Sequence, residues 1–252
     1  MIAQAIHELH AALPSGVALV AVSKFHPVER LMEAYAAGQR LFGENRPQEL
    51  AAKVPLMPAD VQWHFIGHLQ TNKLKLLLPY VSMVESVDSL HLLQAINSWA
   101  IANHRIVDVL LELHLGAEET KQGFSEDEIL DILSLEGISS STSGHPRPDK
   151  REGPAGEASG RGREATVDEE IPSRLNGVRI RGLMGMATHT EDEARIEADF
   201  SRIERLFRKI QAMGVPDFDQ LSIGMSGDWP LAVKHGATLV RIGTDIFGPR
   251  EY

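Results

Sequence analysis

The chain has 252 residues, of which 43% are hydrophobic, so it can form one barrel-sized domain with a large core or two small domains. Its formal charge of -10 argues against a nucleic-acid partner, because neutralising phosphates requires clustered lysine and arginine. Without cysteine, the chain has no disulfide, thiolate metal site or cysteine nucleophile. It also lacks a signal-peptide-like start and any apolar run of membrane-span length, so we expect a cytoplasmic protein with no membrane partner.

Short apolar runs alternate with helical patterns through the first half of the chain. After an opening helix, residues 17–23 (VALVAVS) form a near-continuous apolar run, which is typical of a strand buried on both faces. Ser125 and Glu128 have the spacing of a capping box at the start of a helix. The pattern predicts strands at 40–42, 61–66, 83–87 and 106–115, and helices at 2–13, 27–37, from 47, 71–78, 90–102 and 125–135.

The regular pattern stops at Gly137. Residues 138–170 consist mainly of Ser, Gly, Pro, Arg and Glu and contain almost no large apolar residue. Such a segment cannot bury enough surface to offset the entropy of ordering it. We therefore expect a disordered or loose insertion between the fifth helix of the repeating pattern and the sixth strand, at the amino-terminal face of the sheet.

The alternation returns after the insertion and completes the fold. Strands are predicted at 178–184, 221–223 and 238–242, with helices at 191–213 and 229–235. Eight strands that alternate with helices predict an α/β fold consisting of a single (β/α)8 TIM barrel. The alternative is a doubly wound open sheet, but no GxGxxG follows the first strand to support it.

Two consecutive strands near the C-terminus run into turns of small residues. These turns are Gly224-Met225-Ser226-Gly227 and Gly243-Thr244. A strand that ends in glycines and a hydroxyl just before a helix exposes backbone N–H groups that suit an anion. In barrels, the loops after the seventh and eighth strands often hold phosphate. Two ordinary glycine-rich turns are the alternative interpretation.

Lys24 follows the first strand, where the carboxyl ends of barrel strands form the active-site face. A desolvated lysine has a lowered pKa and leaves an amine that can attack a carbonyl. The alternative is a lysine that extends to solvent at the rim. Placed on the opposite side of the mouth from the two phosphate turns, Lys24 would complete a site for a phosphorylated aldehyde such as pyridoxal 5′-phosphate.

Several motifs, in matching order over almost the whole chain outside the insertion, resemble the YggS/PROSC pyridoxal phosphate homeostasis proteins. The resemblance implies a single barrel like the alanine racemase N-terminal domain, with the cofactor held on Lys24 as a Schiff base. The motifs are VSK (22–24), FGEN (42–45), WHFIGHLQTNK (63–73), GLMGM (182–186), SIGMSGD (222–228) and VRIGTDIFG (240–248).

The same resemblance implies roles for individual residues. Ser226, Gly227, Gly243 and Thr244 would hold the phosphate, beside Met225. Arg241 would face the pyridine nitrogen; because a guanidinium can only donate, that nitrogen would stay unprotonated and the ring would be a weak electron sink. The remaining cofactor-binding residues would be Asn45 near the ring and His64 with Gly67 at the mouth.

This arrangement favours a holder of the cofactor over a catalyst. Only eight residues follow Thr244, so we expect the chain to lack the tyrosine-bearing β domain that completes the site of alanine racemase-like enzymes. We therefore expect a monomeric protein, without robust activity, that stores pyridoxal phosphate or delivers it to dependent apoenzymes. The alternative is a pyridoxal phosphate-dependent racemase or lyase, with His64, His189 or Glu85 as its base.

Two further hypotheses concern other classes of function, a metal site and a protein-interaction module. His64 and His68 are four residues apart, but they lie either side of Gly67 at a strand end and lack the glutamate of an HExxH zinc motif, so a metal site is the weaker interpretation. A barrel that never takes up cofactor and acts as an interaction protein is the other.

Overall fold

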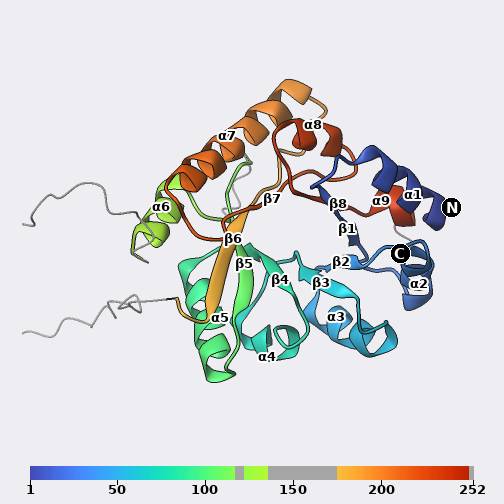
Figure 1. Cartoon of the computed structure of the whole chain (residues 1–252), viewed down its shortest axis with the longest axis horizontal. Coiled ribbons are helices and arrows are strands. Elements are labelled where there is room, and N and C mark those ends of the chain that lie inside the picture. The colour runs from blue at the N-terminus through green and yellow to red at the C-terminus, as the bar shows by residue number, and fades with distance from the viewer. Residues whose placement is uncertain (117–121, 136–174, 250–252) are drawn as a thin grey trace, which may run out of the picture.

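The computed structural model describes residues 1–116, 122–135 and 175–249. Eight parallel strands close into a barrel in the order β1 to β8, so the predicted (β/α)8 fold is confirmed (Figure 1). The strands are β1 (Ala18–Val22), β2 (Leu41–Glu44), β3 (Gln62–Phe65), β4 (Met83–Val87), β5 (Val107–Glu112), β6 (Val178–Met184), β7 (Gln220–Ser222) and β8 (Leu239–Ile242).

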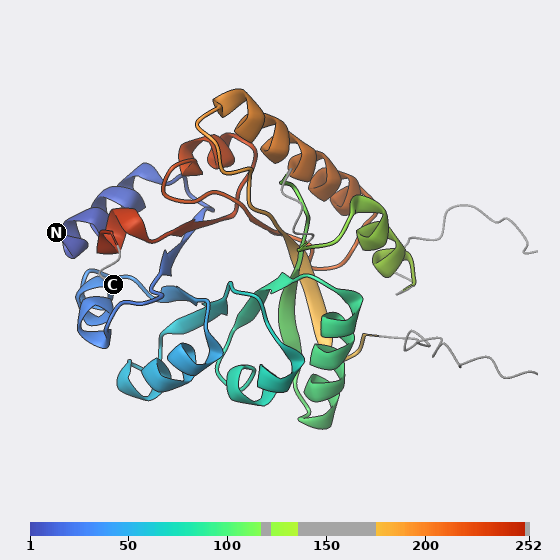
Figure 2. The same ribbon diagram turned by 180° about the vertical axis from the view of Figure 1, so that it is seen from behind.

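The helices form a ring outside the strands, as both views of the molecule show (Figures 1 and 2). The first helix packs against α2 and α9, which brings the two ends of the described chain together. The helices are α1 (Ile2–Ala12), α2 (Val28–Ala36), α3 (Pro47–Lys53), α4 (Leu74–Leu77), α5 (Leu90–Ala102), α6 (Glu126–Leu135), α7 (Glu193–Ala212), α8 (Trp229–Lys234) and α9 (Thr244–Phe247), with 3-10 turns η1 (Val54–Leu56) and η2 (Thr71–Lys73).

The alternation of side chains along each strand creates two apolar layers. In β1, Leu19 and Ala21 join the large core between strands and helices, whereas Val20 belongs to a small cluster inside the barrel. Met83, Leu110, Met184 and Leu239 complete that inner cluster. Residues that lie on the same, inner side of the strands but nearer their carboxyl ends therefore face the barrel mouth.

The structure refines several predicted boundaries. Strand β2 continues through Gly43 and Glu44, beyond the predicted strand at 40–42. The predicted helix 71–78 divides into η2 and the short α4, and α9 was not predicted. The capping box is confirmed, since Ser125 Oγ accepts from the Glu128 N–H at 3.3 Å. The proposed insertion at 138–170 lies outside the described residues.

Gly182 allows the backbones of strands β6 and β7 to approach each other closely. A Cβ added there would lie 1.7 Å from the carbonyl oxygen of Gln220, its neighbour in the sheet. We expect Gly182→Ala to lower the free energy of unfolding by at least about 3 kcal/mol, because backbone rather than a flexible side chain must move. Urea unfolding followed by circular dichroism measures the effect. The control is Gly227→Ala, whose Cβ meets nothing within 4 Å, and an equal loss in both variants would contradict the explanation.

Candidate functional site

A buried polar network spans the barrel interior near the carboxyl ends of the strands. His64 Nδ1 lies 2.6 Å from Glu85 Oε1, and Ser222 Oγ donates to Glu85 Oε2 at 2.5 Å. Arg241 Nη1 donates to the Ser222 carbonyl at 2.8 Å and to Ser222 Oγ at 2.6 Å, and its Nη2 donates to the Gly185 carbonyl at 2.9 Å. Strands β3, β4, β7 and β8 are thus joined through side chains inside the barrel.

The charges in this network compensate one another. Burial would raise the pKa of Glu85, but the hydrogen bond and charge of His64, the charge of Arg241 and the Ser222 hydroxyl bring that pKa below its ordinary value. Burial lowers the pKa of Arg241, and nearby carboxylates, Glu85 first among them, oppose that shift. Glu85 is therefore the ionised counter-charge of Arg241, at 3.9 Å.

Two residues considered as bases or metal ligands are therefore already engaged. His64 and Glu85 bond to each other and are almost fully buried. His68 is half-exposed and pairs with Asp88 at 2.8 Å, away from His64. Within the described ranges, no group of three or more His, Cys, Asp or Glu side chains could hold a metal ion.

The backbone around Lys24 is held on both sides by one charged cluster. Lys53 Nζ, on α3, donates to the Ser23 carbonyl at 2.8 Å, to Glu44 at 2.6 Å and to Glu49 at 2.7 Å. Ser23 Oγ donates to Glu44 at 2.6 Å. The backbone N–H of Phe25, a residue at positive φ, donates to Glu49 at 2.6 Å. These bonds fix the backbone on both sides of Lys24, which lies in the turn directly after β1.

The turns after β7 and β8 present backbone N–H groups. The N–H groups of Ser226, Gly227, Gly243 and Thr244 donate to no acceptor in the part of the chain that the structure describes. The N–H of Met225 is different, because Asp228 Oδ1 accepts it at 2.5 Å. Four of the predicted phosphate residues therefore offer free donors from two adjacent turns, whereas Met225 can contribute its partly exposed side chain but not its N–H group.

Asn45 and Gly67 lie against each other at the ends of β2 and β3. A Cβ on Gly67 would lie 2.3 Å from the Asn45 carbonyl oxygen, so only glycine permits this approach. The side-chain Oδ1 of Asn45 is buried and has no hydrogen-bond partner among the described residues. An orphaned buried acceptor of this kind indicates a donor that the protein itself does not supply.

Glu112, at the end of β5, is a site residue that the sequence analysis did not select. It lies within the strand predicted at 106–115, but nothing in the sequence distinguished it from an exposed glutamate. The structure leaves its side chain almost completely buried. Burial, and after it the charge of Asp88, raise the pKa of Glu112 from 4.5 to about 7, although Arg241 and His68 oppose the shift.

The geometry corrects one expectation. The sequence analysis placed the phosphate turns on the opposite side of the mouth from Lys24. In the closed barrel β1 pairs with β8, and a Cβ on Gly243 would lie 3.1 Å from the Val22 carbonyl oxygen. Lys24 and the second phosphate turn are therefore neighbours, because barrel closure joins the first strand to the last.

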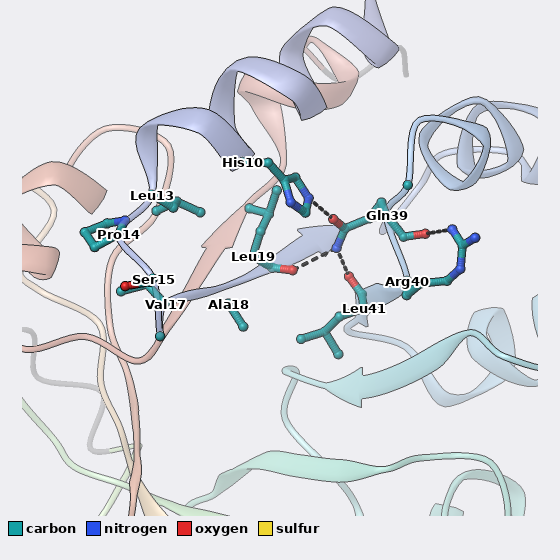
Figure 3. A pocket seen from close by; sticks show the side chains of 12 residues that line it. His10, Leu13, Pro14, Ser15, Val17, Ala18, Leu19, Gln39, Arg40 and Leu41 are labelled. Carbon is teal, nitrogen blue, oxygen red and sulfur yellow. Dashed lines mark hydrogen bonds between the residues drawn. The ribbon is translucent and has the colours of Figure 1, made fainter.

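A cavity of about 340 Å³ lies at the amino-terminal end of the strands, between α1 and the starts of β1 and β2 (Figure 3). Its central polar side chain is Gln39, whose Nε2 donates to the Leu19 and Leu41 carbonyls and whose Oε1 accepts from His10 at 2.9 Å. The oxygen and nitrogen of that amide are therefore both paired within the protein.

The fold and the residues at the barrel mouth define the class of protein. This is a (β/α)8 barrel of the alanine racemase N-terminal domain class, and the model of that family, "Alanine racemase, N-terminal domain", matches residues 1–137. The solved alanine racemase from E. faecalis has the same fold, with a TM-score of 0.67 at 15% identity over 98% of this chain and 57% of that one.

Within this class, the chain belongs to the family of pyridoxal phosphate homeostasis proteins. The member from Schizosaccharomyces pombe is 35% identical over 93% of this chain and 84% of its own length. The member from Vibrio alginolyticus is 32% identical over 95% and 89%. PipY of Synechococcus elongatus, solved with pyridoxal phosphate bound, is 32% identical, with a TM-score of 0.75 over 98% of this chain and 100% of that one. The resemblance seen in the motifs is confirmed.

The raised pKa of Glu112 predicts a stability effect that depends on pH. A carboxyl whose pKa is higher in the folded state than its ordinary value stabilises the fold below that ordinary value, and the contribution is lost as pH rises through about 7. At about 1.4 kcal/mol per pKa unit, neutral Glu112→Gln should be more stable than the wild type by up to about 3 kcal/mol near pH 8, and nearly equal near pH 4.

Thermal and urea unfolding at the two pH values test this expectation. Glu8→Gln, on the exposed face of α1, is the control and should change stability little at either pH. An equal effect of Glu112→Gln at both pH values would show that the carboxyl is not desolvated in the folded protein.

Proposed function

We propose that this chain binds pyridoxal 5′-phosphate at the barrel mouth and serves the homeostasis of that cofactor, by storing it or delivering it. The observation that carries the proposal is the pair of adjacent turns that expose four backbone N–H donors beside the lysine that follows β1. A phosphate monoester needs several such donors, and its aldehyde needs a primary amine nearby.

The residues of the mouth fit this cofactor. Ser226, Gly227, Gly243 and Thr244 would receive the phosphate through their free N–H groups. Lys24 would hold the aldehyde carbon as a Schiff base, and the charged cluster around Lys53 fixes the backbone that carries it. When bound, the cofactor supplies a carbonyl carbon that amines can attack.

The ring would lie among three further residues. Asn45 has an unsatisfied buried oxygen, and Gly67 keeps the adjacent backbone close while His64 lines the mouth. Arg241 uses Nη1 and one Nη2 donor within the protein, which leaves Nε–H and a second Nη2–H among its five donors. One of these would reach the pyridine nitrogen and keep it unprotonated.

This arrangement supports a holder rather than a robust catalyst. A ring nitrogen that receives a hydrogen bond without a proton withdraws electrons weakly, so carbanions beside it are poorly stabilised. Of the three polar groups considered as bases, His64 and Glu85 are bonded to each other and buried, whereas His189 lies in the segment after β6. Relatives of the same fold are enzymes, so the distinction depends on these residues and not on the barrel.

Delivery would take the cofactor to pyridoxal phosphate-dependent apoenzymes, and we propose that the protein acts in the cytoplasm as a monomer without nucleic-acid or membrane partners. Among the described helices, none combines the length and apolar character that crossing a bilayer requires. The acidic charge of -10 supports the absence of a nucleic-acid partner.

Lys24→Ala tests the cofactor site directly. The purified wild-type protein should show an imine absorbance band, and borohydride reduction followed by peptide mapping should find the adduct on Lys24. The variant should lose the band but retain weak binding, because the phosphate donors remain. Lys234→Ala, an exposed lysine of α8, is the control and should keep the band. An adduct on another lysine, or none, would refute the assignment.

The enzyme alternative has its own test. The loaded protein is incubated with the separate enantiomers of small amino acids, and chiral chromatography follows their interconversion and loss. The proposal expects no turnover above the rate of free pyridoxal phosphate. Racemisation or consumption that disappears in Lys24→Ala would show that the protein is a catalyst.

A further inference from the structure

A cavity of about 240 Å³ lies between the carboxyl ends of β5, β6 and the turn after β7. Glu112 and His114 line it from the β5 side, and His189 and Met225 line it from the other side. Met225 directly precedes Ser226 of the phosphate turn, so the cavity borders the mouth where the cofactor would lie. Its size suits a ligand about as large as an amino-acid side chain.

Glu112 brings an unpaired carboxylate into this cavity. Its exposed fraction is 7%, and its side chain makes no hydrogen bond or ion pair with any residue in ranges 1–116, 122–135 and 175–249. It follows Leu110, which faces the barrel interior, by two residues and so points the same way. A buried carboxylate without a partner is unfavourable until a cation or a hydrogen-bond donor meets it.

His114 supplies a second acceptor. Its Nδ1 lies 3.0 Å from the Gln122 carbonyl oxygen. Since a carbonyl can only accept, Nδ1 carries the hydrogen, and in the neutral form of the ring Nε2 has a lone pair that can accept. The wall of the cavity therefore combines a carboxylate with a neutral nitrogen acceptor.

The charges around Glu112 favour a positive ligand. Asp88 is a second carboxylate near it, partnered by His68, and both act on the pKa of Glu112. The guanidinium of Arg241 is engaged inside the barrel with Ser222 and Gly185. Among the described residues that line the cavity, none is lysine or arginine. An incoming cation would thus meet the negative charge of Glu112 with no lysine or arginine among the described residues of the cavity wall.

We propose that this cavity is a subsite for a primary ammonium group, whose N–H donors are accepted by the carboxylate of Glu112 and by Nε2 of His114. This inference rests on the proposed function, because primary amines are the molecules that can replace a lysine at the carbonyl carbon of pyridoxal phosphate. The ammonium could belong to a free small amine or to a lysine side chain of a protein, and both present the same chemistry to the site.

Calorimetric titration of the full-length chain, prepared without added pyridoxal phosphate, with butylammonium chloride tests the subsite. We expect saturable binding that weakens about 10- to 100-fold in Glu112→Gln, because a charge-assisted hydrogen bond is lost. Glu8→Gln should bind as the wild type does. Sodium butyrate, of equal length and opposite charge, should not bind.

The pH dependence gives a second, independent readout. Glu112 ionises as pH rises through about 7, so butylammonium should bind more tightly near pH 8 than near pH 6, and this gain should be smaller in Glu112→Gln. Carbon-13 NMR of the Glu112 carboxyl should show its titration midpoint falling when butylammonium is present. The facing groups that also titrate or carry charge are His68, Asp88, His114, His189 and Arg241.

Equal affinity of the wild type and Glu112→Gln for butylammonium, or preferential binding of butyrate, would overturn the inference. A blocked peptide, acetyl-Gly-Lys-Gly-amide, separates the two sources: affinity equal to that of butylammonium supports a protein lysine, and binding of butylammonium alone supports a free amine. A chain that takes up pyridoxal phosphate but no butylammonium refutes the subsite alone. A chain that binds butylammonium but never takes up pyridoxal phosphate supports the subsite and refutes the proposed function.

Discussion

The buried guanidinium of Arg241 is the constraint on which the barrel mouth depends. A positive charge inside a closed barrel is unfavourable unless carboxylates and hydrogen-bond acceptors surround it. Ser222 and Gly185 supply the acceptors, and Glu85 supplies the negative charge. His64 then completes the coordination of Glu85, so strands β3, β4, β7 and β8 take their relative positions from one charge. His64 and Glu85, which the sequence suggested as catalytic bases, are therefore needed to compensate the buried charge of Arg241.

A second charged cluster fixes the backbone that follows β1, as the bonds of Arg241 fix the strands inside the barrel. Lys53 and two glutamates, Glu44 and Glu49, lie on the helix side of the strand and hold the backbone before and after Lys24. Burial raises the pKa of Glu44, and Lys53 with Ser23 opposes the shift. Because both flanking residues are tied outward, the lysine between them has little freedom in where its backbone directs it. Preorganisation of this kind suits a residue that must meet a carbonyl carbon repeatedly.

The barrel mouth has two parts that differ in their chemistry. Beside β1 and β8, backbone N–H groups and a lysine suit a phosphorylated aldehyde. Beside β5 and β6, Glu112 and His114 offer acceptors without a cation. Opposite electrostatic preferences, side by side, allow an anionic cofactor and a cationic amine to approach the same mouth without competing for the same groups.

The alternation of buried apolar runs with amphipathic helices determined the barrel from the sequence alone, because period-two and period-3.6 patterns report local burial. The same reasoning selected Lys24 and the small-residue turns as candidates, since a strand end and a glycine-rich turn are local features, whereas Arg241 was selected through the resemblance of its motif. Boundaries near η2 and α9 were missed, because helices this short are determined by their tertiary contacts more than by periodicity.

Tertiary structure decided which strand ends are neighbours, and with them the partners of each charge. Closure of the barrel placed Lys24 beside Gly243, where the sequence suggested opposite sides. It also desolvated Glu112, although the sequence shows only an ordinary glutamate at the end of a strand. Periodicity records which side of a strand is buried, but a pKa depends on charges that come from distant segments, and only the folded chain brings those segments together.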